Sequence, residues 1–177
     1  LAADGPIYIQ HLRWRPNGTA TDFGPVSYDV RIDLSAGAVS ASNLSATFAS
    51  NHGSNRTTVF NGVFSVPYTT LSGDPKQWPI QVELDTPFYW DPDRGPLIVD
   101  LRSRGVVGGG NLATIDGAFN TAQVYRQVHT SDPNATTANF PSGGTAQQFG
   151  YSLSLCGVGC NGLAVNYGTA CAGTAGL

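Results

Sequence analysis

Apolar and polar residues alternate twice between residues 78 and 104, first over residues 80–84 and again over residues 97–102. Alternation with a period of two is the pattern of a strand that buries one face. The segment between them, residues 91–95, reads Asp-Pro-Asp-Arg-Gly, and these residue types favour a turn. The pattern therefore predicts two strands that are joined either as a β-hairpin or around a corner, with the polar chemistry in the turn.

The same alternation recurs at close spacing along the chain, with turn signals between the segments. Asn61-Gly62 lies between two apolar pairs and predicts a hairpin turn, because both residues accept a positive φ. Many short strands are typical of sandwiches and jelly rolls. We expect an all-β fold, an antiparallel, jelly-roll-like β-sandwich with strands over residues 7–14, 26–34, 57–60, 63–67, 80–84, 97–102, 114–119, 123–128 and 148–155.

One short helix is expected, from Ser42 or Asn43 to about Ala49. Leu44 and Phe48 are spaced i,i+4 and would share one helix face. Ser42 or Asn43 would cap the first turn.

After residue 155 the chain becomes rich in Gly, Ala and Thr, so we expect a sandwich domain over residues 1–155 and a Cys/Gly-rich tail or linker over residues 156–177. All three cysteines lie in this tail: Cys156, Cys160 and Cys171. Either Cys156 and Cys160 form a local disulfide and leave Cys171 over, or Cys171 pairs back with one of them. An odd cysteine in an extracellular chain also indicates a partner in another chain, or one lost by truncation.

Composition narrows the class of protein. Charged residues make up 12% of the chain, and the net charge of −3 with nine Lys and Arg provides no basic patch for nucleic acid. No apolar run approaches the roughly 20 residues of a transmembrane helix. The chain begins at Leu1, which we interpret as a processed product whose targeting segment is gone. Few lysines and many Ser, Thr, Gly and Asn residues indicate an extracellular or cell-surface location.

Four Asn-x-Ser/Thr sequons fall in predicted turns or loops, where a glycan has room, which makes the chain a candidate glycoprotein. Their acceptor residues are Asn17, Asn43, Asn55 and Asn134.

Candidate chemistry is sparse. Asp91 and Asp93 are a weak calcium candidate, because hard cations prefer carboxylate oxygens, but Asp-Pro-Asp-x-Gly is also an ordinary turn. Asp29, Arg31 and Asp33 share one face of a strand, which predicts a solvated charge ladder rather than a catalytic carboxylate pair. The three histidines have no metal-ligand spacing, and no Gly-x-Ser-x-Gly motif occurs. No other cofactor is expected.

Aromatic side chains offer a different kind of site. Exposed rings stack on sugars, and five residues are available for such a platform, of which Trp78, Tyr89 and Trp90 are the main candidates and Tyr68 and Trp14 the others. In a small sandwich such rings more often belong to the core.

Four short motifs occur in order: LSATFASN at residues 44–51, VFNG at 59–62, LDTPFYWDP at 84–92 and GPLIVD at 95–100. They resemble the motifs LSxxFAxN, VFxG, TPFxYDP and GNLLxD of a family of secreted, surface-associated bacterial β-sandwich domains. The resemblance covers about residues 7–130 and implies an exported sandwich without an assigned activity. The chain differs from the family at Pro96, where Asn is usual, and at Trp90.

These observations favour a non-enzymatic extracellular structural protein, a subunit that self-associates into a homo-oligomer, surface layer or filament. Assembly would proceed by strand addition, with the tail or the strand Ile7–Trp14 pairing with an open sheet edge of a neighbouring copy. The alternative is a carbohydrate-binding or adhesive module that uses exposed aromatic residues.

Overall fold

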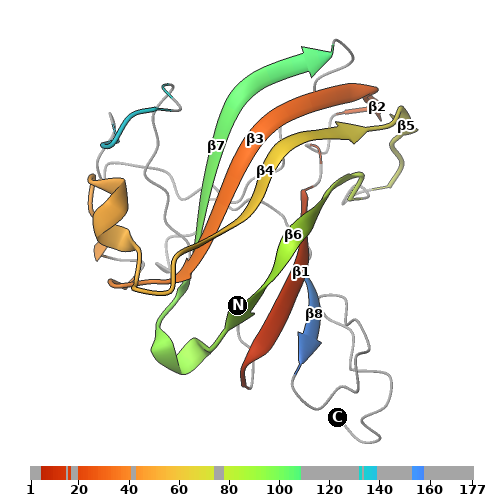
Figure 1. Cartoon of the computed structure of the whole chain (residues 1–177). Helices are drawn as coiled ribbons and strands as arrows, with labels where there is room; N and C mark the ends of the chain where they lie inside the picture. Colours follow the sequence, from red (N-terminus) through yellow and green to blue (C-terminus); the bar gives the residue numbers. More distant parts are fainter. Residues whose placement is uncertain are drawn as a thin grey trace, which may run out of the picture.

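The fold is an all-β antiparallel sandwich, as the alternation predicts (Figure 1). The computed structural model describes residues 5–14, 16, 20–40, 43–73, 78–108, 132 and 134–138, and the backbone alone of residues 153–157. Within these residues two three-stranded sheets face each other, and a two-stranded ribbon lies at one end.

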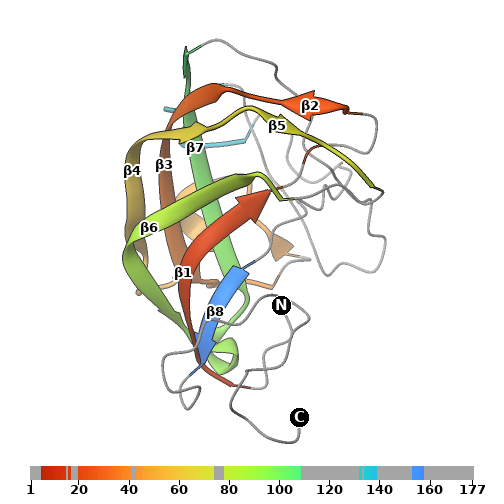
Figure 2. The same cartoon turned by 90° about the vertical axis from the view of Figure 1, so that its right-hand side faces the viewer.

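The first sheet has the strand order β6-β1-β8 (Figure 2). Its central strand is β1 (Ile7–Trp14), which pairs antiparallel with β6 (Ile80–Trp90) on one side and with β8 (Leu153–Gly157) on the other. Even-numbered apolar residues of β6 point into the sandwich, as its alternation predicts. β1 is therefore an interior strand, bonded along both edges within its own chain.

The second sheet has the order β4-β3-β7. The central strand β3 (Val26–Ala36) pairs antiparallel with β4 (Thr57–Val66) and with β7 (Leu97–Gly108). Two short strands, β2 (Asp22–Phe23) and β5 (Thr69–Thr70), form the separate ribbon. β4 runs close to β6, whereas no comparable approach joins β7 to the first sheet within the described residues, so the sandwich is closed along β4 and β6 and open along β7.

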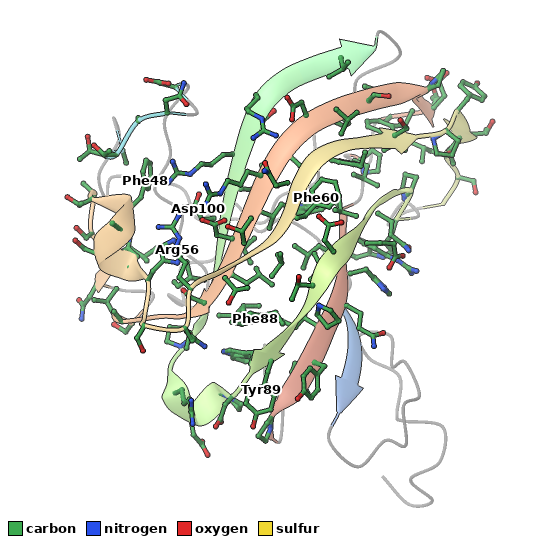
Figure 3. The ribbon with its side chains drawn as sticks, in the orientation of Figure 1. Phe48, Arg56, Phe60, Phe88, Tyr89 and Asp100 are labelled. Carbon is green, nitrogen blue, oxygen red and sulfur yellow. The ribbon has the colours of Figure 1, made fainter. Side chains whose placement is uncertain are left out.

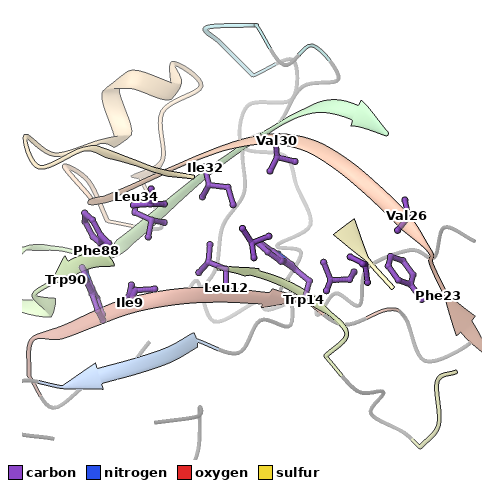
Figure 4. Close-up of a cluster of buried hydrophobic side chains, with 14 of the residues drawn as sticks. Ile9, Leu12, Trp14, Phe23, Val26, Val30, Ile32, Leu34, Phe88 and Trp90 are labelled. Carbon is purple, nitrogen blue, oxygen red and sulfur yellow. The ribbon is translucent and has the colours of Figure 1, made fainter. Parts of the chain in front are cut away.

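The core lies between β1 and β6 of one sheet and β3 and β4 of the other (Figure 4). Burial of these side chains supplies the main driving force for bringing the sheets together. The most deeply buried apolar residues, each at most 1% exposed, are Ile9, Leu12, Phe23, Ile32, Leu34, Val59, Val66 and Val82.

β6 and β7 are joined around a corner and do not form a hairpin, because they belong to different sheets. A single 3₁₀ turn, η3 (Pro92–Arg94), makes the corner, and the indole Nε1 of Trp90 donates to the carbonyl of Gly95 at 3.1 Å. Gly95 has φ +126°, and a Cβ there would lie 2.5 Å from the carbonyl oxygen of Gly37. Only glycine fits this position, so the Gly of the turn motif serves close backbone packing.

The hairpin predicted at Asn61-Gly62 is wrong. Both residues lie inside the continuous strand β4, where Asn61 is opposite Arg31 and Gly62 is opposite Val30. Pairing with β3 along its whole length outweighs the local turn preference, because an extended Asn-Gly pair completes a ten-residue ladder.

The helix predicted from Ser42 or Asn43 to Ala49 is also wrong. In place of an α-helix, the described residues contain the 3₁₀ turn η2 (Phe48–Asn51). The amide of Asn51 explains the change: its Oδ1 accepts from the backbone N of Ser45 at 2.7 Å, and its Nδ2 donates to the carbonyl of Ser45 at 3.0 Å. These bonds hold the chain in a closed loop in which residues 44–46 are not helical.

β6 continues six residues beyond the predicted end at residue 84. Where it passes β1, residues 84–87 lie opposite the single residue Gln10, since Ile9 pairs with Phe88 and His11 with Glu83. Proline cannot donate to the ladder, so Pro87 is tolerated in this bulge. β7 likewise runs to Gly108. β8 (Leu153–Gly157) overlaps the predicted strand 148–155 over residues 153–155 and continues two residues beyond it. The strands predicted over residues 114–119 and 123–128 lie outside the described residues.

Leu34→Ala and Leu101→Ala form a matched pair that tests this core. Leu34 is fully buried and Leu101 is 46% exposed. We expect Leu34→Ala to lower the free energy of unfolding by about 2–5 kcal/mol and Leu101→Ala to change it by less than about 0.5 kcal/mol, measured by urea denaturation. Equal losses at both positions would contradict the open side of the sandwich.

Candidate functional site

The principal polar feature is a charge cluster on the face of the second sheet that points away from the first sheet. Arg31 and Asp33 of β3 lie directly opposite Arg102 and Asp100 of β7. The four residues form a rectangle in which like charges face each other across the strands. Arg56, just before β4, contacts both carboxylates. Figure 3 shows Arg56 beside Asp100.

Asp33 is only 1% exposed and accepts hydrogen bonds from three side chains. Arg31 donates to both of its oxygens, at 2.9 and 3.1 Å, Arg56 Nε donates at 2.9 Å, and Thr58 Oγ1 donates at 2.8 Å. Burial raises the pKa of Asp33, but the hydrogen bonds from Arg31, Thr58 and Arg56 outweigh burial, and its pKa lies below the ordinary value. The carboxylate is therefore held ionised.

Asp100 has a similar environment on the neighbouring strand. Arg102 donates to it at 3.3 and 3.1 Å, Arg56 Nη2 donates at 3.0 Å, and His52 Nε2 lies 3.4 Å away. Burial raises the pKa of Asp100, and the hydrogen bonds from His52 and Arg102 with the charge of Arg56 lower it to about 2. Arg56 thus bonds to both carboxylates and joins β3 to β7 across the top of the sheet.

Ser35, His52 and Asp100 form a chain in the order of a hydrolase triad. Ser35 Oγ lies 2.7 Å from His52 Nδ1. Because the carboxylate of Asp100 only accepts, His52 Nε2 carries the proton of their 3.4 Å contact. Ser35 is fully buried and the His52 side chain is 3% exposed, so no substrate reaches the hydroxyl in this conformation. These contacts link His52, in the loop between β3 and β4, to Ser35 of β3 and Asp100 of β7.

The sequence predicts that Asp29, Arg31 and Asp33 share one strand face in contact with solvent. The shared face is confirmed, but the prediction that Asp33 is solvated is wrong. The side chains of Asp29 and Arg31 are 32% and 45% exposed, but Asp33 is buried. The difference comes from Arg56, which is distant in sequence and covers Asp33. Asp29 pairs instead with Arg104 of β7.

The calcium candidates Asp91 and Asp93 lie at the η3 corner. Asp91 Oδ1 accepts from the backbone N of Asp93 at 3.0 Å, and Arg94 Nε lies 3.6 Å from its other oxygen. These are the contacts of a capped turn. Nowhere in the described part of the chain do three His, Cys, Asp or Glu side chains gather as metal ligands.

The three main aromatic candidates do not form one platform. Trp90 is buried in the core at 2% exposure, Trp78 is half-buried before β6 begins, and Tyr89 is exposed at the opposite end of that strand. Of the other two, Trp14 is buried in the core and Tyr68 is exposed.

Tyr89 has a partner that the sequence analysis missed. It lies opposite Tyr8 of β1, with ring centroids 5.2 Å apart and planes at 61°. The two rings are 38% and 43% exposed. They form an exposed aromatic pair on the outer face of the first sheet.

The remaining candidates fall partly outside the described residues. Cys156 lies in β8, opposite Tyr8, while Cys160, Cys171 and Asn17 are not described. Among the other sequons, Asn43 and Asn134 are exposed. Asn55 is half-buried, and its Oδ1 accepts from the backbone N of Ala36 at 2.9 Å. Asn43 and Asn134 are thus the more accessible acceptors.

β7 forms an exposed edge of the second sheet. In the part of the chain that the structure describes it pairs with β3 alone. Three of its apolar side chains are exposed: Leu101 (46%), Val106 (47%) and Val107 (63%). An unpaired edge with exposed apolar residues is a template for pairing with another strand.

No family model, curated protein or solved structure matches this chain. Within the described residues the structure contains no helix with the length and hydropathy of a membrane span. The resemblance to secreted surface domains therefore stays a prediction.

The charge cluster carried one signal in the sequence. Asp100, Arg102 and Arg104 alternate along their strand just as Asp29, Arg31 and Asp33 do. Two strands with alternating charges can place their charged faces side by side, although here like charges lie opposite each other at Arg31 and Arg102 and at Asp33 and Asp100. The roles of Arg56 and His52 had no such signal, since both lie in a loop.

The variant Asp100→Asn tests the charge cluster through the pH dependence of the free energy of unfolding. Because the pKa of Asp100 is lower in the folded state than the value of about 3.9 expected in the unfolded chain, its ionised form stabilises the fold above about pH 4. That contribution, roughly 2–3 kcal/mol, is lost as the pH falls toward 2. We expect Asp100→Asn to lower the free energy of unfolding by this amount at pH 7 and by little near pH 2.

The measurement is urea denaturation at several pH values, with Asp85→Asn as control, because Asp85 is exposed on β6. If the stability difference between Asp100→Asn and the unsubstituted protein stayed constant from pH 7 to pH 2, the carboxylate would not be the group that titrates.

Proposed function

We propose that the chain is a non-enzymatic structural subunit that assembles with further copies outside the cell through the edge of β7. The observation that carries this proposal is the exposed apolar edge of that strand, with Leu101, Val106 and Val107. The low content of charged residues and the resemblance to exported surface domains support the extracellular location.

The route of assembly differs from the first expectation in one respect. β1 is bonded on both edges within its own chain and is not free to act as a donor. β8 is the better donor, since it pairs with β1 on one side and with no other strand in the described residues. Pairing of β8 from one copy with β7 of the next is a head-to-tail contact, which propagates into a filament unless it closes into a ring.

Two observations favour a structural role over catalysis. Asp33 and Asp100 are each neutralised by two arginines, which leaves neither free as a general acid or base near neutral pH. The serine of the triad-like chain is buried.

Val106→Lys/Val107→Lys tests the assembly edge. Lysines on an edge strand oppose strand addition, because pairing would bury their charges. We expect the unsubstituted protein to form oligomers or filaments as its concentration rises from about 1 μM to about 1 mM, and the double variant to stay smaller over the same range. Sedimentation velocity and electron microscopy provide the measurement.

Val63→Lys is the matched control, since Val63 is 53% exposed on β4, at the closed side of the sandwich. It should assemble like the unsubstituted protein. The proposal would be wrong if the unsubstituted protein were monomeric over the whole concentration range. It would also be wrong if Val63→Lys lost assembly as much as Val106→Lys/Val107→Lys.

A second candidate function is glycan binding, which the exposed pair Tyr8 and Tyr89 favours. Two rings on one sheet face provide an apolar surface on which a sugar ring stacks. Trp90 does not take part, because it is buried.

Tyr8→Ala/Tyr89→Ala tests this candidate on a glycan array. Any glycan bound by the unsubstituted protein should lose at least about tenfold in affinity in the double variant, as expected when two stacking rings are removed. Tyr68→Ala is the control, because Tyr68 is 57% exposed and lies apart from the pair. An array with no bound glycan removes the candidate.

A further inference from the structure

Arg31 and Arg102 stand directly opposite each other on β3 and β7. Like charges in this position repel each other. Each guanidinium is held by the carboxylate two residues away on its own strand: Arg31 donates through Nε and Nη2 to Asp33, and Arg102 donates through the same two nitrogens to Asp100. The two heads are therefore fixed in orientation.

This arrangement leaves donors on both residues. A guanidinium has five N–H groups, and the hydrogen bonds of Arg31 and Arg102 to described residues all start from Nε and Nη2. The Nη1 groups have no acceptor among those bonds. The side chains are 45% and 27% exposed, so the pair is accessible from solvent.

The local charge favours an anion. Four arginines and three aspartates lie on this sheet face, which gives a formal charge of +1 on a chain whose net charge is −3. Arg104 contributes to the field, because its charge is close enough to that of Arg31 to oppose it. Along the strands, Arg31, Arg102 and Arg104 lie on one side of Asp33 and Asp100, and Arg104 is paired there with Asp29. Arg56 lies on the two carboxylates.

We propose that Arg31 and Arg102 bind an oxyanion group, and that the ligand is an acidic polysaccharide that carries sulfate or carboxylate groups. Guanidinium groups bind such oxygens through charge-assisted, often bidentate hydrogen bonds. Asn61 of β4 continues the row beside Arg31, and its Oδ1 accepts from Arg104 Nη1 at 2.8 Å, so polar side chains extend across three strands.

The open shape of the face favours a polymer over a single small ion. The pair lies on a sheet surface and has solvent on its outer side, so one bound ion would keep much of its hydration. A chain with repeated anions gains from several weak contacts at once. This inference is independent of the proposed assembly through β7, because neither arginine is needed for that edge.

The experiment compares dextran sulfate, unsulfated dextran and sodium sulfate by isothermal titration calorimetry at low ionic strength. The variants are Arg31→Gln and Arg102→Gln, and the control is Arg94→Gln, which removes the same charge from a side chain 69% exposed on η3. Both test variants should stay folded, because Asp33 and Asp100 each keep Arg56 as a partner. Circular dichroism checks this.

We expect dextran sulfate to bind and unsulfated dextran not to bind. Arg31→Gln and Arg102→Gln should each weaken binding by about tenfold, since each loses a charge-assisted contact, while Arg94→Gln changes it by less than about twofold. Arg31→Lys, which keeps the charge and loses the planar fork, should also weaken binding.

Three results would overturn the proposal. The first is no binding of dextran sulfate by the unsubstituted protein. The second is equal weakening by Arg94→Gln, which would mean that net charge alone attracts the polymer. The third is binding of sodium sulfate as tight as that of the polymer, which would assign the arginine pair to a free ion.

Discussion

One contact fixes how β3, β7 and the loop before β4 meet: the guanidinium of Arg56 lies between the carboxylates of Asp33 and Asp100. Those carboxylates lie directly opposite each other on neighbouring strands, an arrangement that like charges oppose. Arg56 bonds to both, and Arg31 and Arg102 complete the neutralisation from the other side. Leaving a buried charge without its partner costs about 3–5 kcal/mol, so the cluster requires β3, β7 and the loop before β4 to stay in place together.

Within the described residues the sandwich is open along β7, and this requirement explains how β7 is held there. The core is densest between β1, β6, β3 and β4, and β7 adds only half-buried Leu97 and Val99 to it. Ionic contacts on the outer face attach β7 where apolar burial is weakest: Asp100 with Arg56 at one part of the strand, and Arg104 with Asp29 farther along. β7 is therefore held along the edge that pairs with β3, and within the described residues its other edge is unpaired.

Local alternation was enough to predict the fold class and most strand positions. It placed β1 at its observed bounds and the starts of β3, β6 and β7, because one buried face imposes the period of two wherever it occurs. The alternation pattern gave wrong predictions where contacts with residues distant in the sequence determine the local structure. Asn61-Gly62 is extended because β3 pairs with it, and residues 44–46 are not helical because Asn51 binds the backbone of Ser45. Asp33 is buried because Arg56, which lies in a loop, covers it. The sequence of β3 alone does not predict this burial.

The same bonds that make the charge cluster unsuited to acid–base chemistry make it suited to binding. A carboxylate that is paired with two arginines stays ionised and fixed in position. Its role is then to orient the arginine side chains that bond to it. Arg31 and Arg102 lose little conformational freedom when a ligand arrives, since their Nε–Nη2 edges are already held. Ordering cost is a large part of what weak surface contacts must overcome. Under the two proposals made above, the rigid polar face would bind a polymer and the exposed edge of β7 beside it would bind a neighbouring copy.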